Sequence, residues 1–424
     1  MRGLRPHRFS LAFEAPGYRC LWVYSLFGSG AFTLEMLAQG WLVLQLTNSP
    51  FWVGLAAGLR GATQALFSVL GGPIVDRADR RRMLLTAQLA AALGAMALAT
   101  LLLTHAARLG HVLCYLVLSG VVTAVSKPSA SGLMYDVVGP QRLLNASAFQ
   151  FMAASLVRII GALAGGVVID RLGVAHNYLL ISAAYGGGVA ALFLLRSPAT
   201  VPRATGPFVR AVAAGLGYAL RVREIRALLL LSLVVEAFGF GFQAMMPVMA
   251  RDVLRVGAIG LGSLAAMVGV GQLCATLAVA SRGNPRNKGT LLVAAAIGFG
   301  VFIALFALSP WYSVSLAVVM IVGALGSSYD TSMSTVLMTV SSDEARGRVL
   351  GLYYSTMGVS ALGWLGVGAA ATALGMPAAL ALSGAIVAAG TLGMLPLLHP
   401  LNRLGEVAQP EGASPAGRPV GSPY

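Results

Sequence analysis

The sequence predicts an all-α integral membrane protein with twelve transmembrane helices, arranged as two pseudo-symmetric bundles of six. Three observations support this prediction. Of the 424 residues, 57% are hydrophobic and only 10% are charged, which is more apolar than an ordinary globular domain. Twelve apolar segments are long enough to cross a bilayer core of roughly 30 Å as helices. The two halves of the chain also share short sequence patterns, which indicates an internal duplication.

Short polar turns separate the twelve expected spans, except for one long connection in the middle. That connection, residues 197–226, is basic, contains three prolines and is expected to be a cytoplasmic linker. It divides an N-terminal bundle (residues 1–196) from a C-terminal bundle (residues 227–399), and the tail at residues 400–424 is expected to be disordered. The expected spans are residues 20–45, 51–75, 83–104, 111–135, 145–170, 175–195, 227–250, 257–280, 289–308, 311–339, 349–374 and 377–398.

The basic residues predict the orientation of these spans. A net charge of +15 can indicate a nucleic-acid partner, but the distribution of the charge explains the excess without one. If the turn at Asp76–Arg82 is cytoplasmic, 22 of the 29 Lys and Arg residues fall on that side. The positive-inside rule then predicts that both termini are cytoplasmic. The exceptions are Arg108, Arg171, Arg251 and Arg255 on the outer side and Arg60, Lys127 and Arg158 within spans.

Cysteine and histidine give no sign of a metal or cofactor. The three cysteines and five histidines are scattered singly, without disulfide or metal-ligand spacing. A polytopic membrane enzyme, such as a lipid or prenyl transferase, would need an Asp-rich metal motif or a His/Cys catalytic group at the membrane face. Neither Asp76 with Asp79 nor Asp343 with Glu344 resembles a metal site. An enzyme is therefore only a remote alternative.

The two halves correspond at two places in particular. Val53–Gly58 (VGLAAG) matches Ile259–Ala266 (IGLGSLAA), each at the start of the second span of its half. Asp136–Ala146 matches Thr339–Gly351, each in the turn before the fifth span. Many secondary transporters are built from such repeats, with the substrate site between the repeats near the membrane midplane.

Charge is concentrated in the turn after the second span, GGPIVDRADRRR at Gly71–Arg82. This turn resembles the signature G-x-x-x-D-R-x-x-R-R of the major facilitator superfamily. Asp79, where the usual signature has Gly, makes it similar to the branch of macrolide-efflux and enterobactin-exporter-like proteins. The resemblance covers about residues 10–400 and implies the major facilitator fold in a monomer surrounded by membrane lipids. The residues that carry the signature are Gly72, Asp76, Arg77, Arg80 and Arg81.

The resemblance implies that this turn is a conformational latch. In the family it locks the outward-facing state by pairing its charges with neighbouring helix ends, and it is released as the transporter swings inward. Asp76 and Arg77 would carry that role here. For Arg80–Arg82, the alternative is that these arginines only anchor the topology.

A second motif bears on the direction of transport. In the fifth span, Arg158, Gly161, Gly165 and Gly166 lie in a stretch similar to the antiporter motif G-P-x-x-G-G of exporters in this superfamily. Glycines allow close helix packing, so the helix could pivot against a neighbour across the repeat interface. Ala162 stands where the motif has proline, so the motif is matched only in part. The motif favours export, and ordinary small-residue packing is the alternative.

Four ionisable residues lie within spans that the resemblance implies line the central cavity. A charged residue at the bilayer centre costs roughly 2.5–3.5 kcal/mol on insertion scales, so its presence needs a reason. Burial disfavours the charged form of a carboxylate, which suits a group that binds and releases a proton. Glu236 is the first candidate for proton coupling, followed by Glu35 and Asp330, and a substrate-binding or structural carboxylate is the alternative. Lys127 is a candidate for substrate binding, and no role is assigned to Arg60.

The expected cavity helices also carry aromatic, methionine and amide side chains, which suit bulky amphipathic molecules. The carboxylates would suit cationic drugs, whereas Lys127 and Arg158 would suit an anionic natural product such as a siderophore. The predicted function is export of a drug or siderophore-like molecule in exchange for protons; import or facilitated passage of a small nutrient is the main alternative. The excess of Arg over Lys indicates a GC-rich bacterial genome and hence the bacterial cytoplasmic (inner) membrane. The cavity candidates are Phe27, Phe32, Trp41, Phe238, Phe242, Gln243 and Met246.

Overall fold

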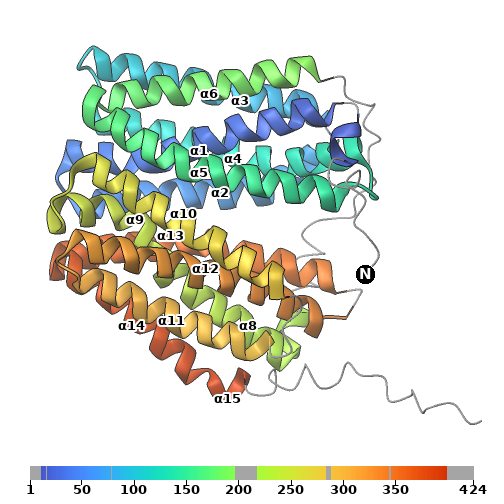
Figure 1. Cartoon of the computed structure of the whole chain (residues 1–424), viewed down its shortest axis with the longest axis vertical. Helices are drawn as coiled ribbons and strands as arrows, with labels where there is room; N and C mark the ends of the chain where they lie inside the picture. Colours follow the sequence, from blue (N-terminus) through green and yellow to red (C-terminus); the bar gives the residue numbers. More distant parts are fainter. Residues whose placement is uncertain are drawn as a thin grey trace, which may run out of the picture.

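The fold is a bundle of long helices (Figure 1). The computed structural model describes residues 11–15, 17–77, 79–195, 217–282, 288–342 and 345–398. Within these ranges there is no strand, and eleven helical segments are long and apolar enough to cross a membrane. Helix α2 is a further long helix in the place of the second expected span. The chain is therefore an all-α, multi-pass membrane protein.

The first half contains six long helices, preceded by a short 3₁₀ turn at Leu11–Glu14. Helix α1 packs against α5 and α6, α3 packs against α4 and α6, and α2 packs along α4. The start of α3 is capped by Asp79, whose carboxylate accepts hydrogen bonds from the backbone N–H groups of Arg81 and Arg82. The six helices are α1 (Tyr18–Thr47), α2 (Pro50–Arg77), α3 (Arg80–Leu103), α4 (Leu109–Val138), α5 (Leu143–Leu172) and α6 (Val174–Leu194).

The second half begins with a span that is interrupted twice. Residues 223–253 form one helical span, in which π-helical turns at Val235–Gly239 and Met249–Val253 flank α9. Such turns occur frequently at functional sites in helices. Glu236 lies in the first of these turns. The helices of this half are α8 (Arg223–Val234), α9 (Gly241–Val248), α10 (Gly257–Arg282), α11 (Lys288–Leu308), α12 (Tyr312–Val340), α13 (Arg346–Leu374), α14 (Met376–Gly393) and the short α15 (Leu395–Leu398).

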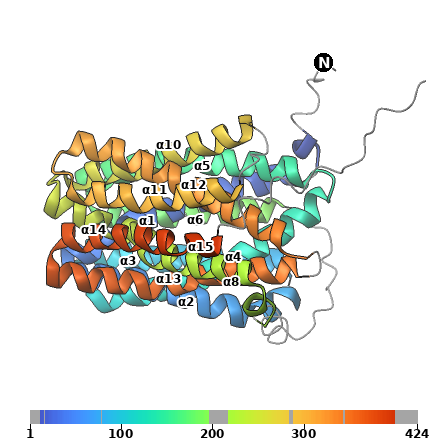
Figure 2. The same ribbon diagram turned by 90° about the horizontal axis from the view of Figure 1, so that it is seen from below.

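The two halves meet through equivalent pairs of helices. Helix α2 packs along α13, and α5 packs along α10, so each pair joins the second helix of one half to the fifth helix of the other (Figure 2). A Cβ added at Gly54 would lie 3.0 Å from the Cα of Gly368, and one added at Gly166 would lie 3.0 Å from the Cα of Gly262. Gly54 and Gly262 belong to the two matching sequence segments. The duplication therefore places glycine at two positions where the backbones of the two halves approach closely.

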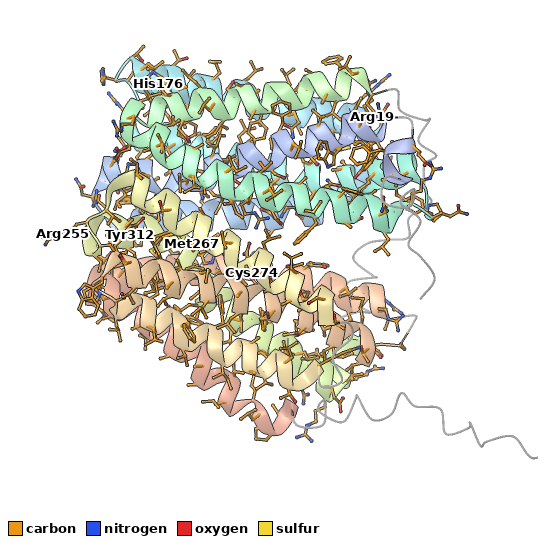
Figure 3. The ribbon with its side chains drawn as sticks, in the orientation of Figure 1. Arg19, His176, Arg255, Met267, Cys274 and Tyr312 are labelled. Atoms are coloured by element: carbon orange, nitrogen blue, oxygen red, sulfur yellow. The ribbon has the colours of Figure 1, made fainter. Side chains whose placement is uncertain are left out.

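The bundle has two distinct ends. The N-terminal end carries Leu11–Glu14 and the first residues of α3 and α5, and the opposite end carries the turns after α1 and α5. Figure 3 shows Arg19 at the N-terminal end and His176 and Arg255 at the opposite end. Most of the expected linker, up to residue 216, and the whole expected tail lie outside the described residues. The boundaries of the two bundles at residues 196 and 227 stay predictions.

Candidate functional site

A cavity of about 650 Å³ lies between the two halves. Helices α1, α2, α4 and α5 line it on one side, and α9, α10, α13 and the π turn after α8 line it on the other. Lining side chains near the opposite end are buried, as Leu261 and Met246 are. Lining side chains nearer the N-terminal end are exposed, and Tyr354 is 57% exposed. The cavity has the volume of a small-molecule site and opens toward the N-terminal end.

Contacts between the halves close the cavity at the opposite end. The guanidinium of Arg251 donates one hydrogen bond to the carbonyl oxygen of Leu44 (3.1 Å) and one to Oδ1 of Asn48 (2.9 Å). Gly40 lies directly against Pro247, because a Cβ at Gly40 would be 2.8 Å from Cγ of that proline. Together with the close glycine contacts between α5 and α10, these contacts close the cavity at the opposite end, and the cavity is open toward the N-terminal end.

Glu236 lies in the cavity wall without a partner for one of its oxygens. The residue is only 4% exposed, and its Oε1 accepts no hydrogen bond from any described residue. Asp330 on α12 is near enough to repel it electrostatically. Oδ1 of Asp330 accepts a hydrogen bond from the Tyr353 hydroxyl (3.3 Å), and Asp330 is not among the described residues that line the cavity. An ionised carboxylate at Glu236 is poorly solvated and poorly compensated there.

Glu35 has the opposite environment. It is fully buried behind the cavity wall, and its carboxylate accepts hydrogen bonds from the hydroxyl groups of Ser119 and Tyr185, the latter at 2.9 Å. The Nε atom of Arg60 lies 3.5 Å from its Oε1. Breaking such a buried, hydrogen-bonded ion pair by removing one partner is strongly destabilising. The structure thus places Glu35 in a network that joins α1, α2, α4 and α6.

Arg60, to which sequence reasoning assigned no role, links this network to the cavity. Its Nε donates to Oγ of Ser119 (3.1 Å), its Nη1 lies 3.3 Å from the sulfur of Met36, and its guanidinium lies 5.1 Å from the centre of the Phe32 ring. The side chain is 6% exposed and lines the cavity, and its Nη2 has no hydrogen-bond partner among the described residues. A lone carboxylate in the first span could have pointed to a cationic partner in a neighbouring span, because unpaired charges are rare there.

Two more cations line the same wall of the cavity. Lys127 is exposed to the cavity and forms an ion pair with no described carboxylate. Arg158 is also exposed, and its Nη1 donates a hydrogen bond to Oε1 of Gln272 across the interface (3.1 Å). Arg60 and Arg158 both act electrostatically on the Lys127 ammonium group. The first-half wall therefore concentrates positive charge.

The aromatic, methionine and amide candidates divide into two groups. Phe32, Gln243 and Met246 line the cavity, whereas the other four are not among its described lining residues. Trp41 and Phe242 are buried between helices, Phe242 packs against Phe299, and Phe238 packs against the main hydrophobic core. Phe27 is 40% exposed and lies against Gly187 of α6. Helix rotation decides these outcomes, because all four have suitable chemistry but point to other neighbours.

Helix α13 supplies lining residues that sequence reasoning did not consider. Tyr354 and Trp364 line the cavity from this helix, and the ring of Trp364 also lies against Gly61 of α2. The resemblance implies that other helices line the cavity, and α13 is not among them. The match between Asp136–Ala146 and Thr339–Gly351 could have pointed to it, because it pairs α13 with the Arg158-bearing helix α5.

The arginines of the expected latch contact helix ends within the first half. Nη1 of Arg80 lies 2.6 Å from Oδ2 of Asp136, at the end of α4. Arg81 donates hydrogen bonds to the carbonyl oxygens of Leu192 (2.9 Å) and Phe193 (3.0 Å), at the end of α6, where cations are favoured. The remaining expected latch residues, Gly72, Asp76 and Arg77, belong to α2, but their side chains lie outside the described part.

The glycines of the antiporter-like motif contact different partners. A Cβ at Gly165 would lie 2.9 Å from Leu34 of α1, whereas a Cβ at Gly166 would lie 2.7 Å from the carbonyl oxygen of Ala258 on α10. A Cβ at Gly161 would make only an ordinary contact, 3.6 Å from Thr33. Gly165 therefore permits close packing within the first half, and Gly166 permits it across the interface.

Among the described residues, no group of three or more His, Cys, Asp or Glu could hold a metal ion.

Known proteins resemble the chain over most of its length. The family described as transmembrane secretion effector matches residues 10–410. The enterobactin exporter EntS of Escherichia coli O9:H4 (strain HS) is 23% identical over 365 residues, which cover 84% of this chain and 87% of the relative. The enterobactin exporter EntS of Shigella boydii serotype 18 matches with the same identity and coverage, 23% over 84% of this chain and 87% of its own.

Solved transporters share the fold at low sequence identity. The nucleoside transporter NupG has a TM-score of 0.67 at 11% identity, with 92% of this chain and 98% of that chain covered. The peptide transporter POT in complex with sulfate gives 0.72 at 13%, with 95% and 99% covered. An inward-facing, occupied bacterial homologue of the human lysosomal transporter Spinster gives 0.65 at 15%, with 98% and 100% covered. The chain belongs to the transmembrane secretion effector family of the major facilitator superfamily, and it is a membrane transporter and not an enzyme.

Proposed function

We propose that this transporter exports amphipathic small molecules across the bacterial inner membrane by alternating access, in exchange for protons. The observation that carries the proposal is the position of Glu236. Its carboxyl group is buried in the wall of a cavity that opens at one end, and one of its oxygens has no described partner. Such a group can take up a proton from either side in turn, as access to the cavity alternates.

Alternating access is supported by the difference between the two ends of the bundle. The opposite end is held shut by Arg251 and by the glycine contacts between α5 and α10, and the cavity opens toward the N-terminal end. The positive-inside rule assigns that end to the cytoplasm, together with both termini. On this assignment the protein faces inward, ready to take a substrate from the cytoplasm. Among the described residues, Arg80 and Arg81 contact the ends of α4 and α6 of the first half.

Proton exchange would supply the energy for export. One charge moving down the membrane potential releases about 2.3 kcal/mol per 100 mV, so proton entry can drive uphill export. Asp330, with its hydroxyl partner Tyr353, is the second candidate for carrying the proton, because it lies beside Glu236. Glu35 is the weakest of the three, since an arginine and two hydroxyl groups already stabilise its charge.

The lining favours bulky substrates with an aromatic or apolar body. Phe32, Trp364, Tyr354 and Met246 offer flat and flexible apolar contacts around the cavity. The relatives that are enterobactin exporters make siderophore-like natural products reasonable candidates beside drugs. Import or facilitated passage of a nutrient is the competing function.

The test is proton flux in liposomes. The purified protein would be reconstituted with a trapped pH dye and an imposed pH gradient, and hydrophobic cations, macrolides and siderophore-like anions would be added in turn. Proton flux that requires a substrate should be lost in Glu236→Gln. The matched control is Glu14→Gln, the same chemical change at a surface carboxylate that pairs with Arg142, and it should keep the flux. Substrate movement that is unchanged in Glu236→Gln and moves no protons would show a facilitator instead.

A further inference from the structure

The charged groups of the cavity are divided unequally between its two walls. The first-half wall carries three cations, Arg60, Lys127 and Arg158, and the second-half wall carries one carboxyl group, Glu236. Only Arg60 has a described carboxylate beside it, namely Glu35. The wall therefore has an excess of positive charge that the described side chains do not neutralise, in a region where unpaired charge is unfavourable.

Arg60 contributes one unpartnered donor to this positively charged wall. Its Nε and Nη1 are used by Ser119 and Met36, and the ring of Phe32 covers its face. Its Nη2 is left without a described partner, although the side chain is 94% buried. A guanidinium held on three sides in a cavity wall, with one buried donor left unpartnered, favours an acceptor that can approach that donor.

Lys127 and Arg158 complete a converging set of donors. Both line the same cavity as Arg60, and both are close enough to one another for their charges to interact. Oε1 of Gln272 accepts a hydrogen bond from Nη1 of Arg158, but the amide carries no negative charge. An anionic group between them would neutralise their repulsion and receive charge-assisted hydrogen bonds, which are stronger than neutral ones.

We propose that the transported molecule carries an acidic group, and that Arg60, Lys127 and Arg158 bind this group on the first-half wall of the cavity. The inference rests on the transport function proposed above and specifies its substrate class: an amphipathic organic acid whose apolar body contacts Phe32 and Trp364. The cavity of about 650 Å³ admits a drug-sized molecule of this kind. Glu236, on the other wall, stays available for the proton.

The test is equilibrium binding of three probes with the same aromatic body and different charge. Dansylglycine is an anion, dansylcadaverine is a cation and dansylamide is neutral, and Trp364 in the cavity can transfer excitation energy to each. With the full chain in phosphatidylcholine nanodiscs, dansylglycine should bind about tenfold or more tightly than the other two, the effect of one charge-assisted contact. Tighter binding of dansylcadaverine would overturn the proposal.

Variants then locate the effect. Lys127→Gln and Arg158→Gln should each weaken the binding of dansylglycine about tenfold and leave the binding of dansylamide unchanged. Lys127→Arg should keep the preference, because it retains the charge. Arg171→Gln removes one positive charge at an exposed site at the end of α5 and should change nothing. Equal binding of dansylglycine by Lys127→Gln and the parent protein would overturn the proposal.

Arg60 needs a paired variant, because removing it alone strands Glu35. In Glu35→Gln/Arg60→Gln both charges of the pair are replaced by amides, and dansylglycine should again bind about tenfold more weakly. Unchanged binding in that folded double variant would remove Arg60 from the proposed site. Since these titrations use no pH gradient and no transport, a failure of proton exchange would leave their outcome unaffected, and the two proposals can fail separately.

Discussion

The first span of each half buries one glutamate, and the two glutamates have opposite surroundings. Glu35 on α1 is enclosed by Arg60, Ser119 and Tyr185, so its charge is compensated and its oxygens are hydrogen-bonded. Glu236 lies in a π turn at the cavity wall with one oxygen unpartnered. A buried carboxylate in a membrane span is therefore not a functional site by its presence alone. Its hydrogen-bond and ion-pair partners decide whether the carboxylate supports the fold or is available to bind and release a proton.

The largest expected effect comes from breaking the paired glutamate. Arg60→Met removes the guanidinium and leaves the Glu35 carboxylate fully buried without its cation. Removing one partner of a buried ion pair destabilises a protein by about 3–5 kcal/mol. We expect a large fall in the free energy of unfolding, measured in detergent by the thermal loss of the folded-protein peak in fluorescence-detected size-exclusion chromatography.

The double variant Glu35→Gln/Arg60→Met provides the control. It replaces both charges with neutral groups of similar size, so most of the lost stability should return, since a buried pair can often be exchanged for neutral residues. If Arg60→Met were as stable as the parent protein, Glu35 would be solvated or protonated, and the contrast with Glu236 would disappear.

A smaller effect is expected from removing one hydrogen bond from Glu35 in the first half or from Asp330 in the second half. Tyr185→Phe takes one donor from the buried Glu35 and should lower the free energy of unfolding by about 1.5–3 kcal/mol, the range for hydrogen bonds to charged groups. Tyr353→Phe takes the longer hydrogen bond from the half-buried Asp330 and should cost about 0.5–1.5 kcal/mol. Chemical denaturation of both variants in the same detergent measures the difference, and equal losses would mean that the two halves hold their carboxylates equally firmly.

Much of the fold could be predicted from the sequence because length and apolarity determine a membrane span. The segments expected at residues 20–45, 111–135 and 289–308 lie within α1, α4 and α11. The matching segments of the two halves also predicted repeats, and the structure shows why they contain glycine: Gly54 and Gly262 lie where the halves touch. Such signals are local in the chain, so one sequence is enough to read them.

The site could be predicted only in part, because it depends on how each helix is rotated. Glu236, Lys127 and Phe32 line the cavity, but Trp41 and Phe242 have suitable chemistry and point into the packing between helices. The pair of Glu35 and Arg60 joins residues of two helices, and a single sequence does not show which faces meet. The π turn at Glu236 also leaves no mark in the pattern of apolar residues.

The smallest expected change in stability is at the unpartnered glutamate. Glu236→Gln replaces a carboxyl group that has an uncompensated oxygen with a neutral amide of nearly the same shape. Burying a poorly paired charge is unfavourable, so the variant should be as stable as the parent or more stable, by up to about 1 kcal/mol. The thermal unfolding assay used for Arg60→Met measures this change.

Glu35→Gln is the matched comparison, because it makes the same substitution in the paired site. It leaves the buried Arg60 guanidinium without its counter-charge, so it should lose about 3–5 kcal/mol where Glu236→Gln loses nothing. Equal destabilisation by both would mean that Glu236 also supports the fold. In that case its loss of proton flux would reflect misfolding. A stable Glu236→Gln protein that still binds dansylglycine but moves no protons would separate the coupling group from the structural one.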